Sequence, residues 1–515
     1  MARPGICLAM AGIVDGSDGS HTHRMNHLKR TFLSVRNKMA WPLLSASIAV
    51  SLAGCSGDGA RDPHETQDAN PSAARFEETA CPQPIPSGLI EGKNVRCGSL
   101  SVPENRANPD QKRIALAVII VRGTDNPAPD PIVHLIGGPG GSYQAYASVL
   151  GGDFGLGMSK RTGRELIIFD QRGTGYSKPF LGCKSDETLE PCLTRLQSEG
   201  IDLASYNTEE SAGDVEDLRR ALGYEKVNLY GQSYGTTLAQ TVMRLYPQGL
   251  RSIVLESVSS VPHDSFLTNS AKSLQLALER VFAECAADAE CANAFPDPSA
   301  DLQASLTWYA ENNIDAAIFV NQLTTLTQFS QGKTYVPLFL RAIATNDPVA
   351  YEGVTKVIAG YEALQANVQV GFSALMLVMM SCYDYASLLT AARDEAVNGD
   401  ARPAFRAALP DRLTSVCAVL PPGRVSEAQR QPFTSEIPTL LISGSHDSNT
   451  PLEIAQALGP SLINHHHVVV PGWGHPILSL GEPCSTDVMR RFINDPSGAP
   501  STECLEKTIF PTTAP

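Results

Sequence analysis

The chain has 515 residues, enough for two to four domains or for one large domain that carries an insertion. Hydrophobic residues make up 43% of the chain and charged residues 18%, a usage typical of folded globular proteins and not of disordered or fibrous ones. The formal net charge of −14 argues against nucleic acid or an anionic lipid surface as the main partner, because both are bound through clustered cations.

The N-terminal region has the pattern of a bacterial export signal. A basic stretch at residues 29–38 precedes an apolar run at residues 39–53, and the run ends in Leu-Ala-Gly-Cys at residues 52–55. As a helix this run would reach about 22 Å, short of the roughly 30 Å hydrocarbon core of a membrane. We therefore predict a signal peptide over residues 1–54. Met25 is a candidate for the true start, because residues 1–24 fit neither a signal nor a domain.

The end of the signal resembles the lipobox of bacterial lipoproteins, in which the cysteine becomes the lipidated first residue of the mature chain. The resemblance implies lipidation at Cys55 and an exported protein anchored to the cell envelope, at the outer membrane facing the periplasm. The membrane would then be a partner only through this anchor. The alternative is an ordinary cleaved signal in which Cys55 is incidental. Residues 55–78 are rich in small and polar residues and are predicted to form a flexible tether.

The 12 cysteines indicate disulfides. None lies in a Cys-x-x-Cys pair, which excludes zinc-ribbon and thioredoxin-type sites. Apart from Cys7 and Cys55 an even number remains, as expected in an oxidising compartment. These cysteines allow about 945 pairings, so the spacing only favours the pairing of neighbours. The favoured pairs are Cys81 with Cys97, Cys183 with Cys192, Cys285 with Cys291, Cys382 with Cys417, and Cys484 with Cys504.

Short apolar runs alternate with amphipathic stretches along much of the chain. The runs lie at residues 114–121, 132–136, 166–169, 227–230, 253–255, 439–442 and 468–470. Such runs are typical of parallel strands that helices cover on both faces. The sequence therefore predicts an α/β fold with a mostly parallel central sheet and helices on both faces, formed by residues 79–260 and 433–515. Residues 261–432 contain helix-like segments without clear strands and are predicted to form an inserted helical cap.

The pentapeptide Gly-Gln-Ser-Tyr-Gly at residues 231–235 lies between a predicted strand and a predicted helix. This is the context of a nucleophile elbow, a strained strand-to-helix turn whose crowding requires glycine two positions before and two after the nucleophile. Ser233 is therefore the candidate nucleophile. A serine hydroxyl needs a base and an orienting acid, which follow the serine in the order Asp, His in folds of this kind.

Asp447 and His475 meet that requirement, since each comes just after a predicted strand and on the same edge of the sheet as Ser233. His446 is a rival base on sequence grounds, but it would lie on the wrong side of the acid. The glycine-rich loop Gly-Gly-Pro-Gly-Gly at residues 137–141 and the N–H of Tyr234 are candidate oxyanion donors, with Gly137 and Gly138 as the loop residues that donate. A phosphate-binding loop would require a following Gly-Lys-Ser/Thr, which is absent from the sequence.

The sequence gives no sign of a cofactor or of a metal site. Three consecutive histidines at residues 465–467 could suggest metal, but three successive residues turning into a strand cannot all face one ion, so we interpret them as a solvated turn.

At this point the chain resembles the α/β-hydrolase superfamily and, more narrowly, the prolyl aminopeptidase and tripeptidyl aminopeptidase family of serine exopeptidases. The resemblance is carried by Gly-Gly-Pro-Gly-Gly at residues 137–141, Asp-Gln-Arg-Gly-Thr-Gly-Tyr-Ser at residues 170–177, and Gly-Gln-Ser-Tyr-Gly-Thr-Thr at residues 231–237. Residues 439–451 and the cysteine-bearing tail to Cys504 resemble the C-terminal region of secreted tripeptidyl aminopeptidases. Ile136 stands where prolyl aminopeptidases usually have histidine, which favours the tripeptidyl-like branch over strict proline specificity.

The resemblance implies a Ser-His-Asp exopeptidase that acts through an acyl-enzyme on short peptides. It also implies an acidic residue that binds the substrate's free α-amine, for which Asp384 and Glu256 are candidates, although each could equally be a solvated or ion-paired carboxylate. Asp170 and Arg172 are interpreted as structural residues that hold a loop near the active site. Two alternatives stay open: a carboxylesterase or lipase-like hydrolase acting on small esters, and a catalytically silent surface binding protein.

Overall fold

The computed structural model describes residues 73–143, 150–264, 268–328, 335–368, 370–385, 388, 390–409, 413–478 and 482–513. The predicted signal peptide and the predicted lipidation site at Cys55 lie outside these ranges. Within them, no helix is both long enough and apolar enough to cross a membrane.

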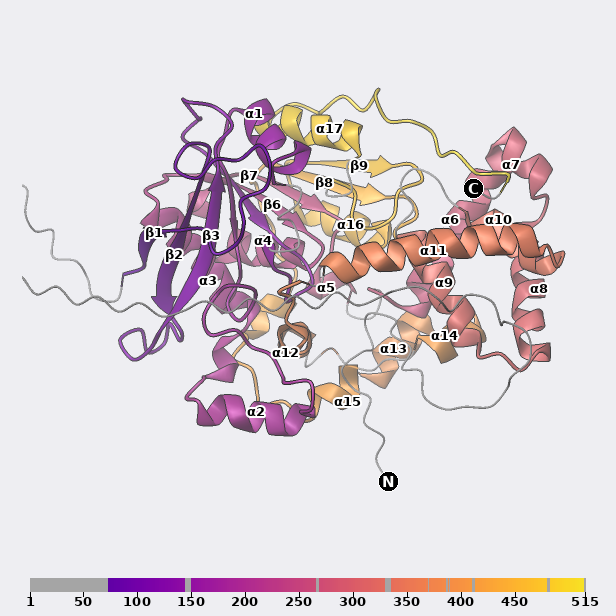
Figure 1. The fold of residues 1–515 in the computed structure, drawn as a ribbon, viewed down its shortest axis with the longest axis horizontal. Coiled ribbons are helices and arrows are strands. Elements are labelled where there is room, and N and C mark those ends of the chain that lie inside the picture. The colour runs from indigo at the N-terminus through magenta and orange to yellow at the C-terminus, as the bar shows by residue number, and fades with distance from the viewer. Residues whose placement is uncertain are drawn as a thin grey trace, which may run out of the picture. The chain divides into compact units, whose positions relative to one another are not determined.

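Nine strands of the described chain form one sheet in the order β1-β2-β3-β5-β4-β6-β7-β8-β9 (Figure 1). The pairs β1–β2, β2–β3 and β3–β5 are antiparallel, whereas every pair from β5 through β4 to β9 is parallel. Their bounds are β1 Arg75–Thr79, β2 Val95–Pro103, β3 Arg113–Val121, β4 Ile132–Leu135, β5 Leu166–Phe169, β6 Val227–Gln232, β7 Leu250–Glu256, β8 Thr439–Gly444 and β9 His465–Val470. The α/β fold with a mostly parallel sheet, expected from the sequence, is confirmed.

One strand differs in direction from its prediction. The apolar run at residues 114–121 forms most of β3, which pairs antiparallel with both β2 and β5. The run is apolar because both faces of β3 are covered, and an apolar pattern reports burial and not strand direction. Alternation of side chains then divides the strand between two cores: Leu116 and Val118 belong to one hydrophobic cluster, Ile119 and Val121 to the other.

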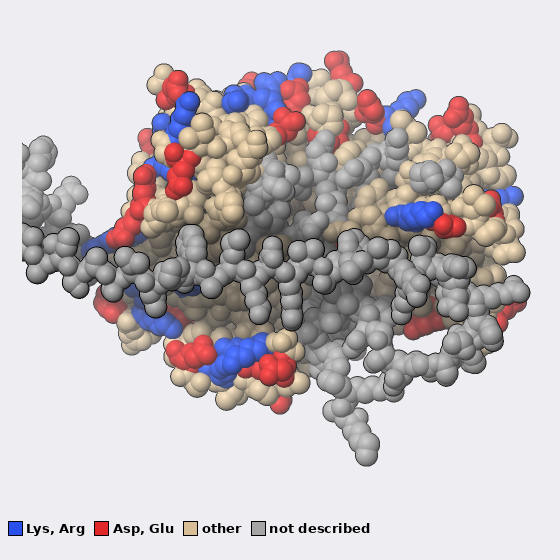
Figure 2. All heavy atoms as spheres, viewed as in Figure 1, with Lys and Arg blue, Asp and Glu red and all other residues tan. Residues whose placement is uncertain are grey.

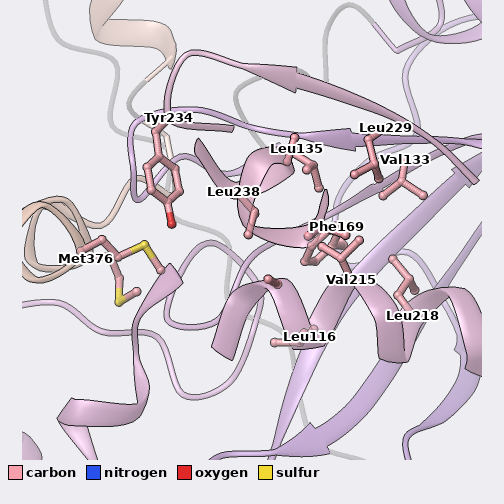
Figure 3. Packing of buried hydrophobic residues seen from close by; sticks show 14 of the residues in the cluster. Leu116, Val133, Leu135, Phe169, Val215, Leu218, Leu229, Tyr234, Leu238 and Met376 are labelled. Carbon is pink, nitrogen blue, oxygen red and sulfur yellow. The ribbon is translucent and has the colours of Figure 1, made fainter. Parts of the chain in front are cut away.

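Helices cover both faces of the sheet. One face packs against α3 (Thr208–Ala221), α4 (Tyr234–Leu245) and α16 (Leu452–Leu458), with α2 (Leu189–Ser198) at its margin. Figure 3 shows this core, in which Val215 and Leu218 of α3 and Leu238 of α4 meet the strand residues Leu135 and Phe169. The other face packs against α1 (Met158–Thr162) and α17 (Pro483–Asn494).

The described part of residues 261–432 holds helices and no strand of the sheet. These helices are α5 Val261–Asp264, α6 Ala271–Ala287, α7 Ala289–Ala294, α8 Pro298–Glu311, α9 Ala316–Gln328, α10 Val336–Ala344, α11 Pro348–Val368, α12 Ala374–Tyr385, α13 Ala391–Asn398, α14 Pro403–Ala408 and α15 Leu413–Cys417. Helices α6 to α11 and α14 share a separate hydrophobic cluster that contains Phe319, Phe339 and Phe405. Helix α12 differs, because its Met376, labelled in Figure 3, packs into the sheet core. Met379 of the same helix belongs to the same cluster.

The ten cysteines from Cys81 onward form disulfides in the structure, and the partners are the sequence neighbours that the spacing favoured. The pairs are Cys81–Cys97, Cys183–Cys192, Cys285–Cys291, Cys382–Cys417 and Cys484–Cys504. On the face shown in Figure 2, acidic and basic side chains are interspersed. Elsewhere in the described chain, Arg195 of α2 pairs with Glu187 at 2.8 Å and with Glu199 at 3.1 Å.

The C-terminal segment joins the helical insertion to the core. Phe510 is only 8% exposed and packs into the cluster of the inserted helices, and Thr508 donates a hydrogen bond to Glu284 of α6. We expect Phe510→Ala to destabilise the protein by about 3 kcal/mol, because the truncation leaves a cavity that the cluster cannot fully close. Urea unfolding measures this loss. Ile509→Ala is the matched control, since Ile509 is 54% exposed and should cost little; equal losses for both variants would contradict the packing role of Phe510.

Candidate active site

Ser233 occupies a strained turn between β6 and α4. Its backbone has φ 56° and ψ −126°, a left-handed conformation that is costly for a residue other than glycine. The neighbouring glycines are required by close approach: a Cβ on Gly235 would lie 1.9 Å from the carbonyl oxygen of Leu135, and one on Gly231 would lie 2.5 Å from that of Gly235. The local sequence thus forms the elbow geometry predicted for it, with Ser233 at the carboxyl edge of the sheet.

Asp447 and His475 lie on the same edge, after β8 and β9. The Nδ1 atom of His475 is 2.9 Å from Oδ2 of Asp447. The other oxygen of Asp447 accepts hydrogen bonds from the backbone N–H groups of Asn449 and Thr450, each at 2.8 Å. The Thr450 hydroxyl adds a hydrogen bond of 3.0 Å to Oδ2. These contacts hold the carboxylate with its Oδ2 directed at Nδ1 of the imidazole.

Asp447 and His475 are both buried, and the charge of each shifts the pKa of the other in the direction opposite to the shift caused by burial. Burial raises the pKa of the Asp447 carboxyl, but the nearby His475 and the hydrogen bonds lower it further, so that it lies below its usual value. Burial lowers the pKa of His475, but the Asp447 charge and hydrogen bond, together with the charge of Glu256, raise it above its usual value. The site therefore favours a negative Asp447 and stabilises a protonated His475.

His446 takes no part in this pair. Its Nε2 atom lies 3.0 Å from a carboxylate oxygen of Glu284 on α6. Nearby, Arg280 of the same helix donates a hydrogen bond of 2.6 Å to the carbonyl of Ser445. The loop that carries Asp447 is thus attached to the helical insertion through the residues just before the acid. His446 thus contacts the helical insertion, whereas His475 contacts Asp447.

The helical insertion also contacts the loop that carries His475. A Cβ on Gly474 would lie 2.2 Å from the carbonyl oxygen of Thr327, so the end of α9 packs directly on this loop. The backbone N–H of His475 donates to the carbonyl of Gln328, and the Thr327 hydroxyl lies 2.7 Å from that of Ser448. The insertion therefore supports both the loop that carries Asp447 and the loop that carries His475.

The glycine-rich loop after β4 approaches Ser233 closely. A Cβ on Gly137 would lie 2.8 Å from the Cβ of Ser233 and 3.4 Å from its Oγ. The N–H of Tyr234 belongs to the first residue of α4, where helix N–H groups lack partners within the helix and can bind an anion. These positions suit an oxyanion site made of backbone N–H groups from the loop and from Tyr234.

The segment at residues 170–177 braces that loop. Asp170 is fully buried and accepts hydrogen bonds from the N–H groups of Tyr143, at 2.8 Å, and Tyr176, at 2.7 Å. Burial raises the pKa of Asp170 to about 7, although these hydrogen bonds oppose the shift. Arg172 is also buried and forms an ion pair of 2.7 Å with Asp214 of α3. Both residues have the supporting contacts expected of them.

The two candidate amine-binding carboxylates lie in different places. Asp384, near the end of α12, is 1% exposed, and its Oδ2 accepts a hydrogen bond of 2.6 Å from Thr208. The Thr208 hydroxyl is also 2.8 Å from the hydroxyl of Tyr234, the residue after Ser233. Glu256 is 0% exposed, and its oxygens accept hydrogen bonds from Tyr230, Gln232, Ile477 and Leu478. The four donors from which the Glu256 oxygens already accept hydrogen bonds favour a supporting role and not amine binding.

The sequence suggested that the three histidines at residues 465–467 form a solvated turn, and this prediction was wrong. They begin β9 and pair with residues 439–441 of β8, because the backbone ladder extends past the apolar run. His465 Nδ1 lies 2.6 Å from the carbonyl oxygen of Leu462, and His467 Nε2 lies 3.0 Å from the Ser443 hydroxyl. Within the described residues no group of three or more His, Cys, Asp or Glu side chains is arranged to hold a metal ion.

Two residues that contact the candidate site were not predicted from the sequence, Thr450 and Gln171. Thr450 follows Asp447 at a spacing typical of Asx turns, so a turn pattern could have indicated its contact with the acid. Gln171 donates a hydrogen bond of 2.8 Å to the carbonyl of Ile136, just before the glycine-rich loop. No local pattern predicts that contact, because the two residues meet only when β4 and β5 pair.

Comparison with known proteins agrees with this architecture. Residues 130–482 match the family described as alpha/beta hydrolase fold. A protein named Serine protease Hip1 from Mycobacterium tuberculosis is 24% identical over 91% of this chain and 99% of its own length. Tripeptidyl aminopeptidase from Streptomyces lividans is 28% identical over 33% of this chain and 37% of its own length.

A proline iminopeptidase from Lactobacillus delbrueckii subsp. bulgaricus is 30% identical over 25% of this chain and 35% of its own length. Among solved structures, proline iminopeptidase from Mycobacterium smegmatis is similar with a TM-score of 0.36 and 17% identity, covering 78% of this chain and 98% of that one. The family match spans more than half of the chain and includes strands β4 to β9, the elbow and the loops that carry Asp447 and His475. The chain therefore belongs to the α/β hydrolase family and is a serine hydrolase of that fold.

Proposed function

We propose that this enzyme is a serine exopeptidase that cleaves peptide bonds near the free N-terminus of short peptides, with Ser233, His475 and Asp447 as its catalytic triad. The observation that carries the proposal is the 2.9 Å contact between His475 and Asp447 on the same sheet edge as the strained Ser233. The peptidase assignment draws on the named relatives, which include a serine protease, a tripeptidyl aminopeptidase and a proline iminopeptidase.

The proposed mechanism follows from the hydrogen-bond contacts that the atoms of His475 and Asp447 already make. Asp447 holds Nδ1 of His475, so Nε2 is the nitrogen that takes the proton from Ser233 as its Oγ attacks the substrate carbonyl. The negative charge that develops on the carbonyl oxygen is met by N–H groups of Gly137, Gly138 and Tyr234. His475 then gives its proton to the leaving amine, and water releases the acyl group by the reverse sequence of steps.

Asp384 is the better placed candidate for the substrate's α-amine. It lies in α12, next to the Thr208 and Tyr234 hydroxyls, and its charge contributes to raising the pKa of Tyr234, after burial. We expect Asp384→Asn to raise KM for free-amine peptide amides by about tenfold or more, because the variant loses one charge-assisted hydrogen bond to the substrate. It should leave kcat nearly unchanged. Steady-state kinetics on tripeptidyl amides measures this change.

The matched control for this variant is Asp301→Asn, because Asp301 is a buried carboxylate of α8 that pairs with Arg341 at 3.2 Å within the insertion. The KM of Asp301→Asn for the same tripeptidyl amides should equal that of the wild type. Amides with an acetylated N-terminus should be poor substrates of the wild type and should not distinguish it from Asp384→Asn. Equal turnover of free and acetylated amides by the wild type would contradict the exopeptidase assignment, and activity on esters alone would favour a carboxylesterase.

The raised pKa of His475 sets the expected pH dependence. The base must be neutral to accept the proton from Ser233, so activity is lost as the pH falls through this pKa. Because Asp447 and Glu256 hold it above its usual value, we expect the acid limb of kcat/KM to lie above about pH 6.5. Measuring kcat/KM in a constant-ionic-strength buffer series tests this expectation; a limb near pH 5 would contradict it.

A further inference from the structure

Glu256 contacts the elbow and the histidine loop at once. It is the last residue of β7, between the strands that precede Ser233 and Asp447 in the sheet order. Its backbone carbonyl accepts a hydrogen bond of 3.0 Å from the N–H of Ser233. Its side chain, 0% exposed, reaches the loop after β9. A single residue therefore links the nucleophile's backbone to the segment that carries the base.

The contacts of the Glu256 carboxylate are all with hydrogen-bond donors. One oxygen accepts from the backbone N–H groups of Ile477 and Leu478, the latter at 2.8 Å, two and three residues after His475. The other oxygen accepts from the Tyr230 hydroxyl and, at 3.4 Å, from the amide of Gln232. An ionised carboxylate is an acceptor only, so this set of partners matches the charged form.

The charges around His475 are few in the described part of the chain. Asp447 faces it from the loop after β8 and Glu256 from the end of β7, and both raise the pKa of the imidazole against the effect of burial. Glu256 in turn is faced by Tyr230 of β6 and by His475. Burial raises the pKa of Glu256, and its hydrogen bonds and the nearby His475 offset part of that increase. Two carboxylates thus act on one imidazole.

We propose that Glu256 is a positioning residue for catalysis: its carboxylate fixes the loop that carries His475 and supplies a second negative charge that stabilises the imidazolium formed when Ser233 is acylated. This inference rests on the proposed triad. Asp447 orients His475 through a direct contact with Nδ1, whereas Glu256 acts from another strand through the backbone of Ile477 and Leu478 and through its charge.

The test is the rate at which a fluorophosphonate labels Ser233, measured against pH, which requires no knowledge of the peptide substrate. Glu256→Gln keeps the size of the side chain and an acceptor for the two N–H groups but removes the charge. We expect its acid limb to move to lower pH by about one unit, and its plateau rate to fall about tenfold, because one pKa unit corresponds to a tenfold change in the stabilisation of the imidazolium. Glu256→Asp restores the charge and should return the limb toward its wild-type position.

The matched control is Glu165→Gln. Glu165 is also a buried carboxylate that accepts a hydrogen bond from a tyrosine, Tyr224, but it precedes β5 and so lies at the opposite edge of the parallel strands. Its labelling profile should match that of the wild type. Thermal melting of each variant shows that it is folded. If Glu256→Gln does not fold, Tyr230→Phe removes one hydrogen bond to the same carboxylate and should shift the limb in the same direction by less.

The outcomes separate this inference from the triad on which it rests. If the wild type labels at Ser233 but Glu256→Gln has a lowered plateau and an unmoved acid limb, Glu256 is structural only and the inference is wrong. A limb shift of the same size in Glu165→Gln would assign the effect to the total charge of the protein and would overturn it as well. A wild-type protein that does not label at Ser233 would refute the triad itself.

Discussion

Replacing Ser233 by alanine is expected to abolish fluorophosphonate labelling and to lower kcat for peptide amides by about a millionfold. The variant removes the only side-chain atom that can form the acyl-enzyme in the proposed mechanism, whereas the oxyanion donors and the substrate contacts remain. Residual activity of about a thousandfold over the uncatalysed reaction would come from those contacts. Labelling followed by intact-mass measurement, together with peptide hydrolysis, tests both effects.

The control for this variant is Ser257→Ala. Ser257 is also buried, also has a left-handed backbone with φ 53°, and directly follows Glu256 at the end of the adjacent strand. Among the described residues its hydroxyl has no hydrogen-bond partner, so its removal should cost little. Labelling and turnover of this variant should remain close to those of the wild type. Labelling that persists in Ser233→Ala would identify a different nucleophile and refute the assignment.

Replacing Asp447 by asparagine is expected to lower kcat about ten-thousandfold with little change in folding. The amide retains the shape of the carboxylate and can still accept hydrogen bonds from the N–H groups of Asn449 and Thr450. Toward His475, however, it presents a neutral group and favours the tautomer whose Nε2 carries a proton and cannot act as a base. Steady-state kinetics measures the loss, and thermal melting verifies the fold.

His446→Gln tests which of the two histidines, His446 or His475, is the base that works with Asp447. His446 contacts Glu284 of α6, and glutamine can still donate a hydrogen bond to that carboxylate. We expect this variant to keep kcat within about tenfold of the wild type. If His446→Gln lost as much activity as Asp447→Asn, the assignment of His475 as the base would be wrong.

The fold and the order of the site residues could be predicted because their signals are local. Ser233 is recognisable from the glycines on either side, and the structure explains them by the 1.9 Å approach of a Gly235 Cβ to Leu135. Asp447 and His475 could be placed because each follows an apolar run, and the ends of parallel strands meet at one edge of a sheet. The direction of β3 could not be predicted, because burial on both faces produces the same apolar pattern in either direction.

The sequence by itself determined the elbow at Ser233, the order of the candidate acid Asp447 and the candidate base His475, the mostly parallel sheet and the interruption by helices, since each depends on residues that are close along the chain. Only the tertiary structure decided which buried carboxylate supports which group. Glu256 meets Ile477 across 221 positions, and Asp384 meets Thr208 across 176. The function of a carboxylate depends on its burial and on the donors around it, and strand pairing and helix packing, not local sequence, bring those donors into contact.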